Sequence, residues 1–166
     1  MEYRLIEKSH GNILGISIWK YVRNSVYTKK LLKAIARNCP KIERLNVRIE
    51  LENLNDIREI FLNCPQLKKL FLYTDNNDGL NCDELLKILS DDSPKTLNQF
   101  SFSEYWNFSV DALQNFFENW RGRIPIKFNT RFDKSFYFKE KHIMVLDKYF
   151  EEGVIDKKTK YLYGIT

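Results

Sequence analysis

The stretch "NCPQLKKLFLYT", residues 63–74, is an altered copy of "NCPKIERLNVRI", residues 38–49. Both begin with Asn, Cys and Pro, and both continue with three apolar residues spaced LxxLxL. Unrelated loops have no reason to share this order, so the match indicates a structural repeat. Self-similarity at a step of about 20 to 50 residues is typical of solenoids and other repeat architectures.

The apolar spacing occurs at four places and, in a weaker form, at a fifth. The four triplets are Ile13, Ile16 and Ile18; Ile42, Leu45 and Val47; Leu67, Leu70 and Leu72; and Leu97, Phe100 and Phe102. In "GRIPIKFN", Ile126 and Phe128 fill the last two positions, Arg123 takes the first, and Pro125 removes a backbone donor. A terminal repeat is expected to be atypical.

The segments between the triplets predict helices, because their apolar residues recur with a period of 3.6. We expect helices near 28–38, 55–63, 82–90 and 109–120, with Thr28 and Ser109 as N-terminal caps. Strands are expected near 13–19, 42–48, 67–73, 97–103 and 124–129. A strand, a helix and a second parallel strand form a right-handed crossover, and repetition of this unit gives a solenoid. All triplet residues should then be buried.

The shared "NCP" is interpreted as a helix end. Asn38 and Asn63 fall where a left-handed C-terminal cap is needed, and a Pro two residues later prevents the helix from continuing. The Cys between them is expected to be a small buried residue, because free cysteine is among the most buried residue types.

These residues resemble the leucine-rich repeat family over about 12–130, and the cysteine-bearing pattern "NCPxLxxL" is most similar to its F-box type. The resemblance implies an α/β, horseshoe-like solenoid with a parallel sheet on the concave side and helices on the convex side. It also implies a substrate receptor of a ubiquitin ligase. The residues before the first triplet are too few for an F-box, so a ligase adaptor is expected as a partner only if a separate F-box is present.

One domain is expected, because 166 residues with 43% hydrophobic content can bury a core. Residues 1–130 should form four to five repeats, and 131–166 a capping segment with a helix near 139–152. No apolar run is long enough to span a membrane, and the charged start is unlike a secretory signal. A cytoplasmic or nuclear location follows. Three cysteines without a CxxC pair indicate neither a disulfide framework nor a zinc site.

No enzyme motif is present. The sequence contains no GxSxG, Gly-rich phosphate loop, HExxH or kinase set. The stretch "DNNDG", residues 75–79, lacks the alternating ligands of a calcium loop and predicts a polar loop. We therefore expect a protein that is not an enzyme and that binds neither a cofactor nor a metal.

The positive charge is concentrated in one segment. Residues 121–148 hold eight Lys and Arg against three Asp and Glu, and their balance of +5 equals that of the whole chain. Aromatic residues interleave with these cations, a pattern that suits nucleic-acid binding through stacking and phosphate contact. The alternative is a cap whose aromatics close the core while its charges face water. We favour the cap, and nucleic-acid binding by 121–148 is the second functional hypothesis.

A partner surface follows from the period of two in a strand. If Leu45 and Val47 point into the core, their neighbours point out of the sheet, and the same step applies to every strand. The expected partner-binding residues on the concave face are Trp19, Arg44, Asn46, Arg48, Lys69, Phe71, Tyr73, Gln99, Ser101 and Lys127. Aromatic residues among Arg and Lys match the composition of interface anchors. A protein or peptide with acidic and apolar groups is therefore the expected partner.

Overall fold

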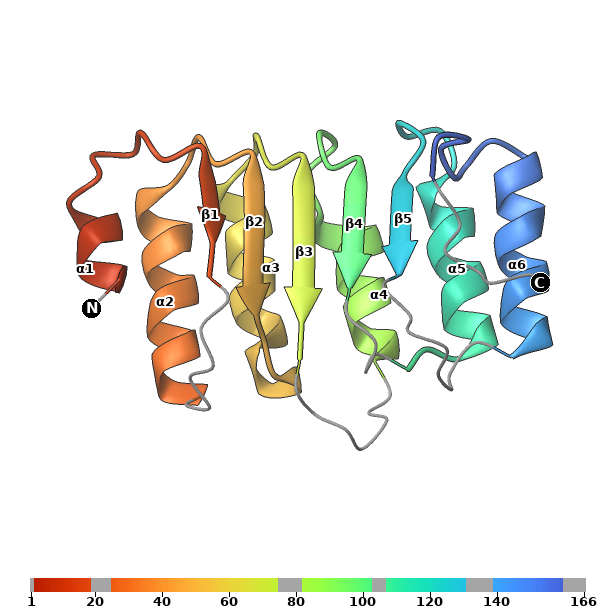
Figure 1. Ribbon diagram of the computed structural model, residues 1–166, viewed down its shortest axis with the longest axis horizontal. Coiled ribbons are helices and arrows are strands. Elements are labelled where there is room, and N and C mark those ends of the chain that lie inside the picture. Colours follow the sequence, from red (N-terminus) through yellow and green to blue (C-terminus); the bar gives the residue numbers. More distant parts are fainter. Residues whose placement is uncertain (1, 19–24, 75–81, 103–106, 131–138, 160–166) are drawn as a thin grey trace.

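The computed structural model describes residues 2–18, 25–74, 82–102, 107–130 and 139–159, in which helices and strands alternate along the chain (Figure 1). The elements are α1 (Glu2–Glu7), β1 (Gly15–Ser17), α2 (Ser25–Asn38), β2 (Arg44–Arg48), the short 3-10 helix η1 (Leu51–Asn53), α3 (Leu54–Asn63), β3 (Lys69–Tyr73), α4 (Asp83–Asp92), β4 (Gln99–Phe102), α5 (Val110–Trp120), β5 (Lys127–Thr130) and α6 (Glu140–Glu151).

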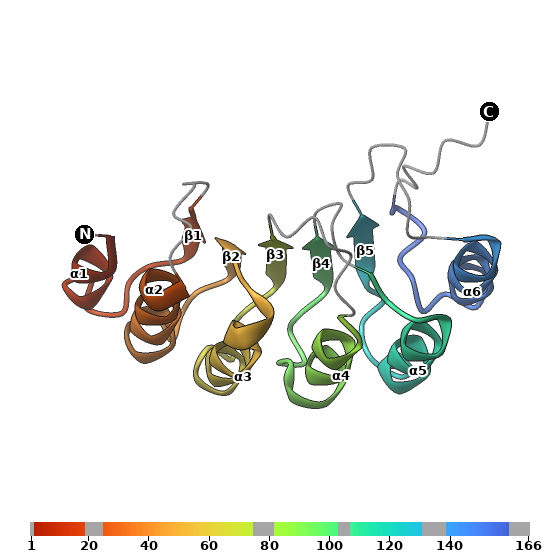
Figure 2. The same cartoon turned by 90° about the horizontal axis from the view of Figure 1, so that it is seen from below.

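The strands form one parallel sheet in the order of the sequence, from β1 to β5. The helices cover one side of this sheet, and the two layers follow an arc with the sheet on its inner, concave side (Figure 2). This confirms the α/β leucine-rich repeat solenoid. The first apolar residue of each triplet lies in the turn before its strand, so the strands begin about two residues later than expected.

The strands pair without a shift between repeats. Gly15, Arg44, Lys69, Gln99 and Lys127 are consecutive partners across the five strands. A forked hydrogen bond fixes this register at the start of β2, where the carbonyl of residue 14 accepts the N–H groups of residues 43 and 44 at 2.9 and 3.2 Å. The carbonyls of residues 43 and 68 accept pairs of N–H groups from the following repeat in the same way.

The triplets fill the core between sheet and helices. The second, third and fourth triplets are buried, as are Ile126 and Phe128 of the last repeat. The expectation is wrong for Ile13, Ile16 and Ile18, which are only partly buried. The reason is that β1 is the outermost strand of the sheet and has a neighbour on one side only among the described residues.

The helix ends are closed differently from the prediction. The side-chain amides of Asn38 and Asn63 donate to the carbonyl four residues earlier, at 2.9 and 2.8 Å. Ser93 stands at the equivalent position of the next repeat, and its hydroxyl makes the same bond. The left-handed cap is wrong, because His10 is the only residue other than glycine with a positive φ in the described part. At these helix ends the side-chain amide of Asn acts as a hydrogen-bond donor to a carbonyl of the last turn.

Of the two predicted N-terminal caps, Ser109 is confirmed and Thr28 is wrong. The Ser109 hydroxyl accepts the N–H of Ala112 at 3.1 Å and caps α5, as expected. Thr28 does not begin α2, because that helix already starts at Ser25 and Thr28 is buried within its first turn.

Arg123 occupies the first apolar position of the last repeat and binds backward to the repeat before it. Its guanidinium lies 3.7 Å from the centre of the Trp120 ring and donates to the carbonyls of Ser93 and Pro94 at 3.3 and 2.8 Å. These carbonyls belong to the turn that follows α4, in which the Pro94 carbonyl also accepts the N–H of Leu97 at 3.0 Å. The charged side chain of Arg123 therefore fits a position that is apolar in the other repeats, because it binds the turn after α4 and stacks on Trp120.

The C-terminal end of the solenoid is covered. Ile126 forms a parallel bridge with Ile155, with its N–H donating to Val154 and its carbonyl accepting from Asp156, at 3.0 and 2.9 Å. Behind this bridge α6 packs on α5, and the rings of Phe117 and Tyr149 lie 5.1 Å apart. The boundary between 1–130 and 131–166 falls next to residues outside the described ranges, so this division stays a prediction.

Among the described residues, no helix has both the length and the apolar character that a membrane crossing requires.

Replacement of Arg123 by Ala should lower the free energy of unfolding by about 1–3 kcal/mol, because two partly buried carbonyls lose a charged donor and Trp120 loses its stacking partner. Urea denaturation monitored by circular dichroism measures this change. Lys95→Ala, an exposed change on the neighbouring loop, is the control and should stay within about 0.5 kcal/mol of the wild type. Equal stabilities of the two variants would contradict the role given to Arg123.

Candidate partner-binding surface

The concave face of the sheet, which faces away from the helices, carries three rows of side chains (Figure 2). Each row crosses the strands. In β2 and β3, buried residues alternate with residues that reach solvent, so the expected inward and outward directions are observed. The register places equivalent outward positions side by side. We call the row of Arg44, Lys69, Gln99 and Lys127 the basic row.

At its start, over β2 and β3, the basic row presents two cations that form no salt bridge among the described residues. Arg44 and Lys69 are direct partners in the sheet and both are exposed. Neither has a salt-bridge partner within the described part of the chain, and the nearby carboxylate of Glu43 binds Lys68 at 2.7 Å instead. Lys127, at the far end, lies 3.9 Å from Asp156. The basic row is therefore available to an anion mainly over β2 and β3.

The second row combines short polar side chains with one aromatic ring. Asn46 donates to the Ser17 hydroxyl at 3.2 Å, and Asn129 donates to the Ser101 hydroxyl at 3.4 Å. Phe71 lies half-buried between these pairs. Ser101 itself is buried, which limits its direct contact with a partner. The row thus offers an apolar centre directly next to the basic row.

The third row differs from the prediction in what its residues contact. Arg48 donates through two nitrogens to one oxygen of Glu50, at 3.1 and 2.7 Å, and its side chain is only 10% exposed. The Tyr73 hydroxyl reaches across β2 and donates to the carbonyl of Ile18. Both side chains therefore hold the fold together. Trp19, the remaining predicted residue of this surface, lies outside the described residues.

The described part of the basic segment 121–148 is largely occupied by internal contacts. Arg121 binds Glu118 and Glu152, and Lys148 binds Glu118 at 3.3 Å. Arg123 contacts the Trp120 ring and the Ser93 and Pro94 carbonyls. Lys139 and Lys141 are exposed, and 131–138 are outside the described ranges. The contacts of α5 and α6 thus favour the capping interpretation over phosphate binding.

The three cysteines are buried free thiols. Burial raises the pKa of Cys39 to about 11 and the pKa of Cys64 and Cys82 to about 12. Thiols of this kind stay protonated and unreactive at neutral pH. No group of three or more metal-binding side chains is found among the described residues, and the "DNNDG" stretch lies outside them.

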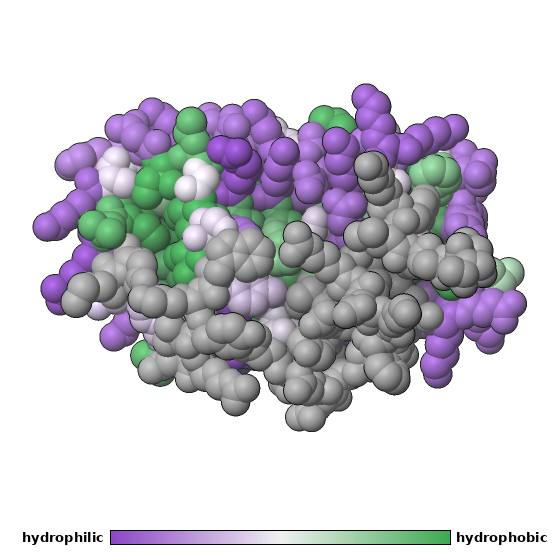
Figure 3. Space-filling model, in the orientation of Figure 1, coloured by the Kyte–Doolittle hydropathy of each residue, from purple (hydrophilic) through white to green (hydrophobic). Residues whose placement is uncertain are grey.

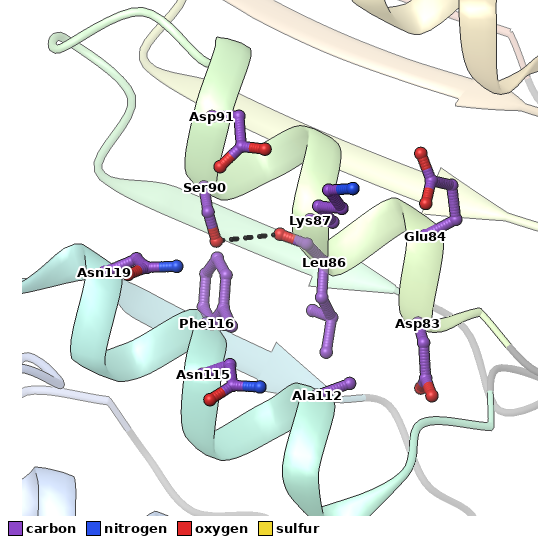
Figure 4. A pocket seen from close by; sticks show the side chains of 10 residues that line it. All are labelled: Asp83, Glu84, Leu86, Lys87, Ser90, Asp91, Ala112, Asn115, Phe116 and Asn119. Carbon is purple, nitrogen blue, oxygen red and sulfur yellow. Dashed lines mark hydrogen bonds between the residues drawn. The ribbon is translucent and has the colours of Figure 1, made fainter.

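The sequence did not predict a groove between α4 and α5 on the helical side of the molecule. It has a volume of about 380 Å³. Asn115 and Asn119 line it from α5, and Ser90 donates within it to the carbonyl of Leu86 (Figure 4). Only the spacing of four residues between the two asparagines on a helix hinted at this groove. Its polar groups are side chains that any solvated helix face carries.

Comparisons with known proteins identify the fold. Neither a protein-family model nor a curated protein sequence matches the chain. Among solved structures, the tropomodulin C-terminal domain from Caenorhabditis elegans is similar with a TM-score of 0.60 over 90% of this chain and 92% of that chain. The identity is 13%, so the similarity shows the fold alone. The F-box and ubiquitin-ligase parts of the sequence resemblance receive no support from these comparisons.

The Glu118 cluster predicts an acid-dependent contribution to stability. Hydrogen bonds lower the pKa of Glu118 from 4.5 to about 2, and the bond from Arg121 contributes most, followed by the bond from Tyr149. A carboxylate with a lowered pKa stabilises the fold above its unfolded pKa, and this contribution is lost as the pH falls from about 4.5 to about 2. Wild type should exceed Glu118→Gln in stability at pH 7, and the difference should shrink at pH 3.

Urea denaturation at the two pH values measures this difference. Glu151→Gln removes one exposed carboxylate from the same part of the chain and is the control. A stability gap between wild type and Glu118→Gln that is unchanged at pH 3 would show that the contacts of Glu118 do not lower its pKa.

Proposed function

We propose that this chain is a protein-binding module that holds an acidic segment of a partner protein on the concave face of its sheet. The observation that supports this most is the adjacent pair Arg44 and Lys69. Both are exposed, neither forms a salt bridge in the described part of the chain, and half-buried Phe71 lies beside them. Leucine-rich repeats and related solenoids use their extended concave surfaces for binding.

The spacing of the sheet determines the kind of ligand that fits. Neighbouring strands lie about 4.8 Å apart, so the cations of the basic row follow one another along a line that crosses the strands. An extended acidic peptide that crosses the strands can place carboxylates along this line. Hydrogen bonds between a carboxylate and Arg or Lys are charge-assisted and strong. Phe71 provides the apolar anchor that protein interfaces use.

A protein fits this face better than a nucleic acid. Nucleic-acid affinity depends on many phosphate contacts made by Lys and Arg. On the described part of this face, two cations form no salt bridge, and Arg121, Arg123 and Lys148 of the basic segment are engaged within the fold. An acidic peptide with an apolar residue uses Phe71 as well as the cations.

The resemblance of "NCPxLxxL" to the F-box type supports a finer proposal: the partner is a substrate that is presented to a ubiquitin ligase. The adaptor of such a ligase would require an F-box in addition to the residues described here. A cytoplasmic or nuclear location, which this role needs, stays a prediction. Affinity purification with mass spectrometry tests this role, since ligase subunits should co-purify with the chain and its partner.

Selection from a displayed random-peptide library tests the concave face. The enriched peptides should be acidic and contain an apolar residue, and Lys69→Glu should weaken their binding at least tenfold, or about 1.4 kcal/mol. Lys87→Glu makes the same charge change on an exposed position of α4 and should bind within twofold of wild type.

Thermal denaturation must show that both variants are folded. Substitution of Arg48 or Tyr73 is unsuitable for this purpose, because their contacts with Glu50 and Ile18 contribute to stability. Enrichment of basic peptides, or full-strength binding by folded Lys69→Glu, would rule out the proposed surface. Displacement of the peptide by RNA at low salt would favour the nucleic-acid hypothesis.

A further inference from the structure

The two edges of the sheet end differently. At the β5 end, Ile126, directly before the strand, forms an isolated parallel bridge with Ile155, and the segment around Ile155 covers the start of this edge. At β1 no such segment is found among the described residues, and β1 pairs with β2 alone. A strand edge with open backbone groups is a site at which another strand can pair.

The hydrogen bonds to β2 show which backbone groups of β1 face outward. The carbonyl of Leu14 and the N–H of Ile18 bind β2. Successive residues of a strand direct their backbone groups to opposite sides, so the N–H and C=O groups of Gly15 and Ser17 point away from β2. Both residues are exposed. The open edge therefore offers two donors and two acceptors at alternate residues.

Apolar side chains lie behind this edge. Helices α1 and α2 extend past β1 at this end of the molecule (Figures 1 and 2). Ile13 and Ile16 are only half-buried there, and Leu5 and Leu14 are 72% and 52% exposed. Hydrophobic residues gather on the sheet side of the molecule over α1 and β1 (Figure 3). An added strand would cover these side chains with every second residue.

The side chain of Arg44 places a cation next to this edge, on the concave face of the sheet. The guanidinium of Arg44 lies over Gly15, where a Cβ atom would be 3.5 Å from its Nε. This position is open because Gly15 has no side chain. Arg44 has no salt-bridge partner among the described residues. An outward side chain of an added strand, placed next to Gly15, would come within reach of this charge.

From these features we propose that the edge of β1 binds an extended peptide that pairs with Gly15 and Ser17. Its apolar residues alternate with acidic ones, the apolar side chains covering α1 and α2 and an acidic side chain facing Arg44. This is strand addition, in which backbone bonds supply affinity and alternate side chains supply specificity. The site is separate from the surface over β2 and β3 and shares only Arg44 with it.

A second copy of the chain does not fit this edge by extending the sheet. Helices α1 and α2 already extend beyond β1 on the side where the next strand would lie (Figure 2). A second copy would bring its own helical layer into the space that α1 and α2 occupy. A peptide without a helical layer meets no such obstacle, which is why the occupant is a single extended segment.

A peptide of alternating valine and glutamate, labelled with fluorescein, is the probe. It should bind the full chain in a fluorescence polarisation titration, and a peptide of alternating valine and lysine should bind at least tenfold more weakly. A scrambled valine and glutamate peptide, without the period of two, should also lose at least tenfold. Failure of the alternating valine and glutamate peptide to bind, or equal binding of all three, would overturn the proposal.

Backbone pairing is tested on the protein and on the peptide. Ser17→Pro removes an outward N–H without removing a backbone hydrogen bond to β2, although the hydroxyl that accepts from Asn46 is lost, and it should weaken the probe at least fivefold. Ser17→Ala keeps that N–H while it removes the same hydroxyl, and it should bind within twofold of wild type. If Ser17→Pro does not fold, N-methylation of alternate peptide residues replaces it, since one of the two alternate sets should abolish binding and the other should not.

The outcome separates this site from the concave face. Lys69→Glu should leave binding of the alternating valine and glutamate peptide within threefold, whereas Ser17→Pro should not. The reverse result, with loss for Lys69→Glu and no effect of Ser17→Pro or of either N-methylated set, would overturn the edge site and place the probe on the concave face.

Discussion

The forked hydrogen bond between repeats is the constraint on which this structure depends. The carbonyl before each of β1, β2 and β3 accepts two N–H groups of the next repeat, so neighbouring strands start at the same level. Because side chains alternate along a strand, a slip of one residue would turn every apolar residue of that strand toward solvent. The same register that buries Leu45, Leu70 and Phe100 side by side also aligns the exposed residues of the basic row.

The ends of the array show what happens when a repeat has one neighbour only. At the C-terminal end the last fork is incomplete, since residue 127 alone donates to the carbonyl of residue 98 while Ile126 donates to Val154. That change attaches the cap, and Arg123 secures the same repeat from the helix side. At the N-terminal end, half-buried Ile16 and Ile18 mark a repeat whose outer side remains accessible. A solenoid gains stability through neighbours, so this end can gain from an added strand.

Local sequence pattern was sufficient for the fold because each repeat is built from contacts between equivalent positions. The triplets gave the strands, the period of 3.6 gave the helices, and the alternation gave the outward side of β2 and β3. The sequence pattern did not predict contacts between residues at non-equivalent positions of different repeats. The hydrogen bond from Tyr73 to Ile18 joins residues that are 55 apart in the sequence. Arg123 stands at the first triplet position of its repeat, but its guanidinium binds the turn after α4. The donor role of Asn38 and Asn63 was missed for a different reason, since Asn satisfies either a left-handed cap or a bond to the carbonyl four residues earlier.

The distribution of charge on the sheet separates residues that serve the fold from those left for recognition. Arg48 is bound to Glu50, so its charge is balanced within the molecule. Arg44 and Lys69 face each other on neighbouring strands, and like charges at directly opposed positions destabilise a sheet. Gln99 occupies the equivalent position of β4, which shows that the scaffold accommodates a neutral side chain there. The fold therefore does not require the two adjacent cations, and an acidic ligand is what would turn their mutual repulsion into a favourable interaction.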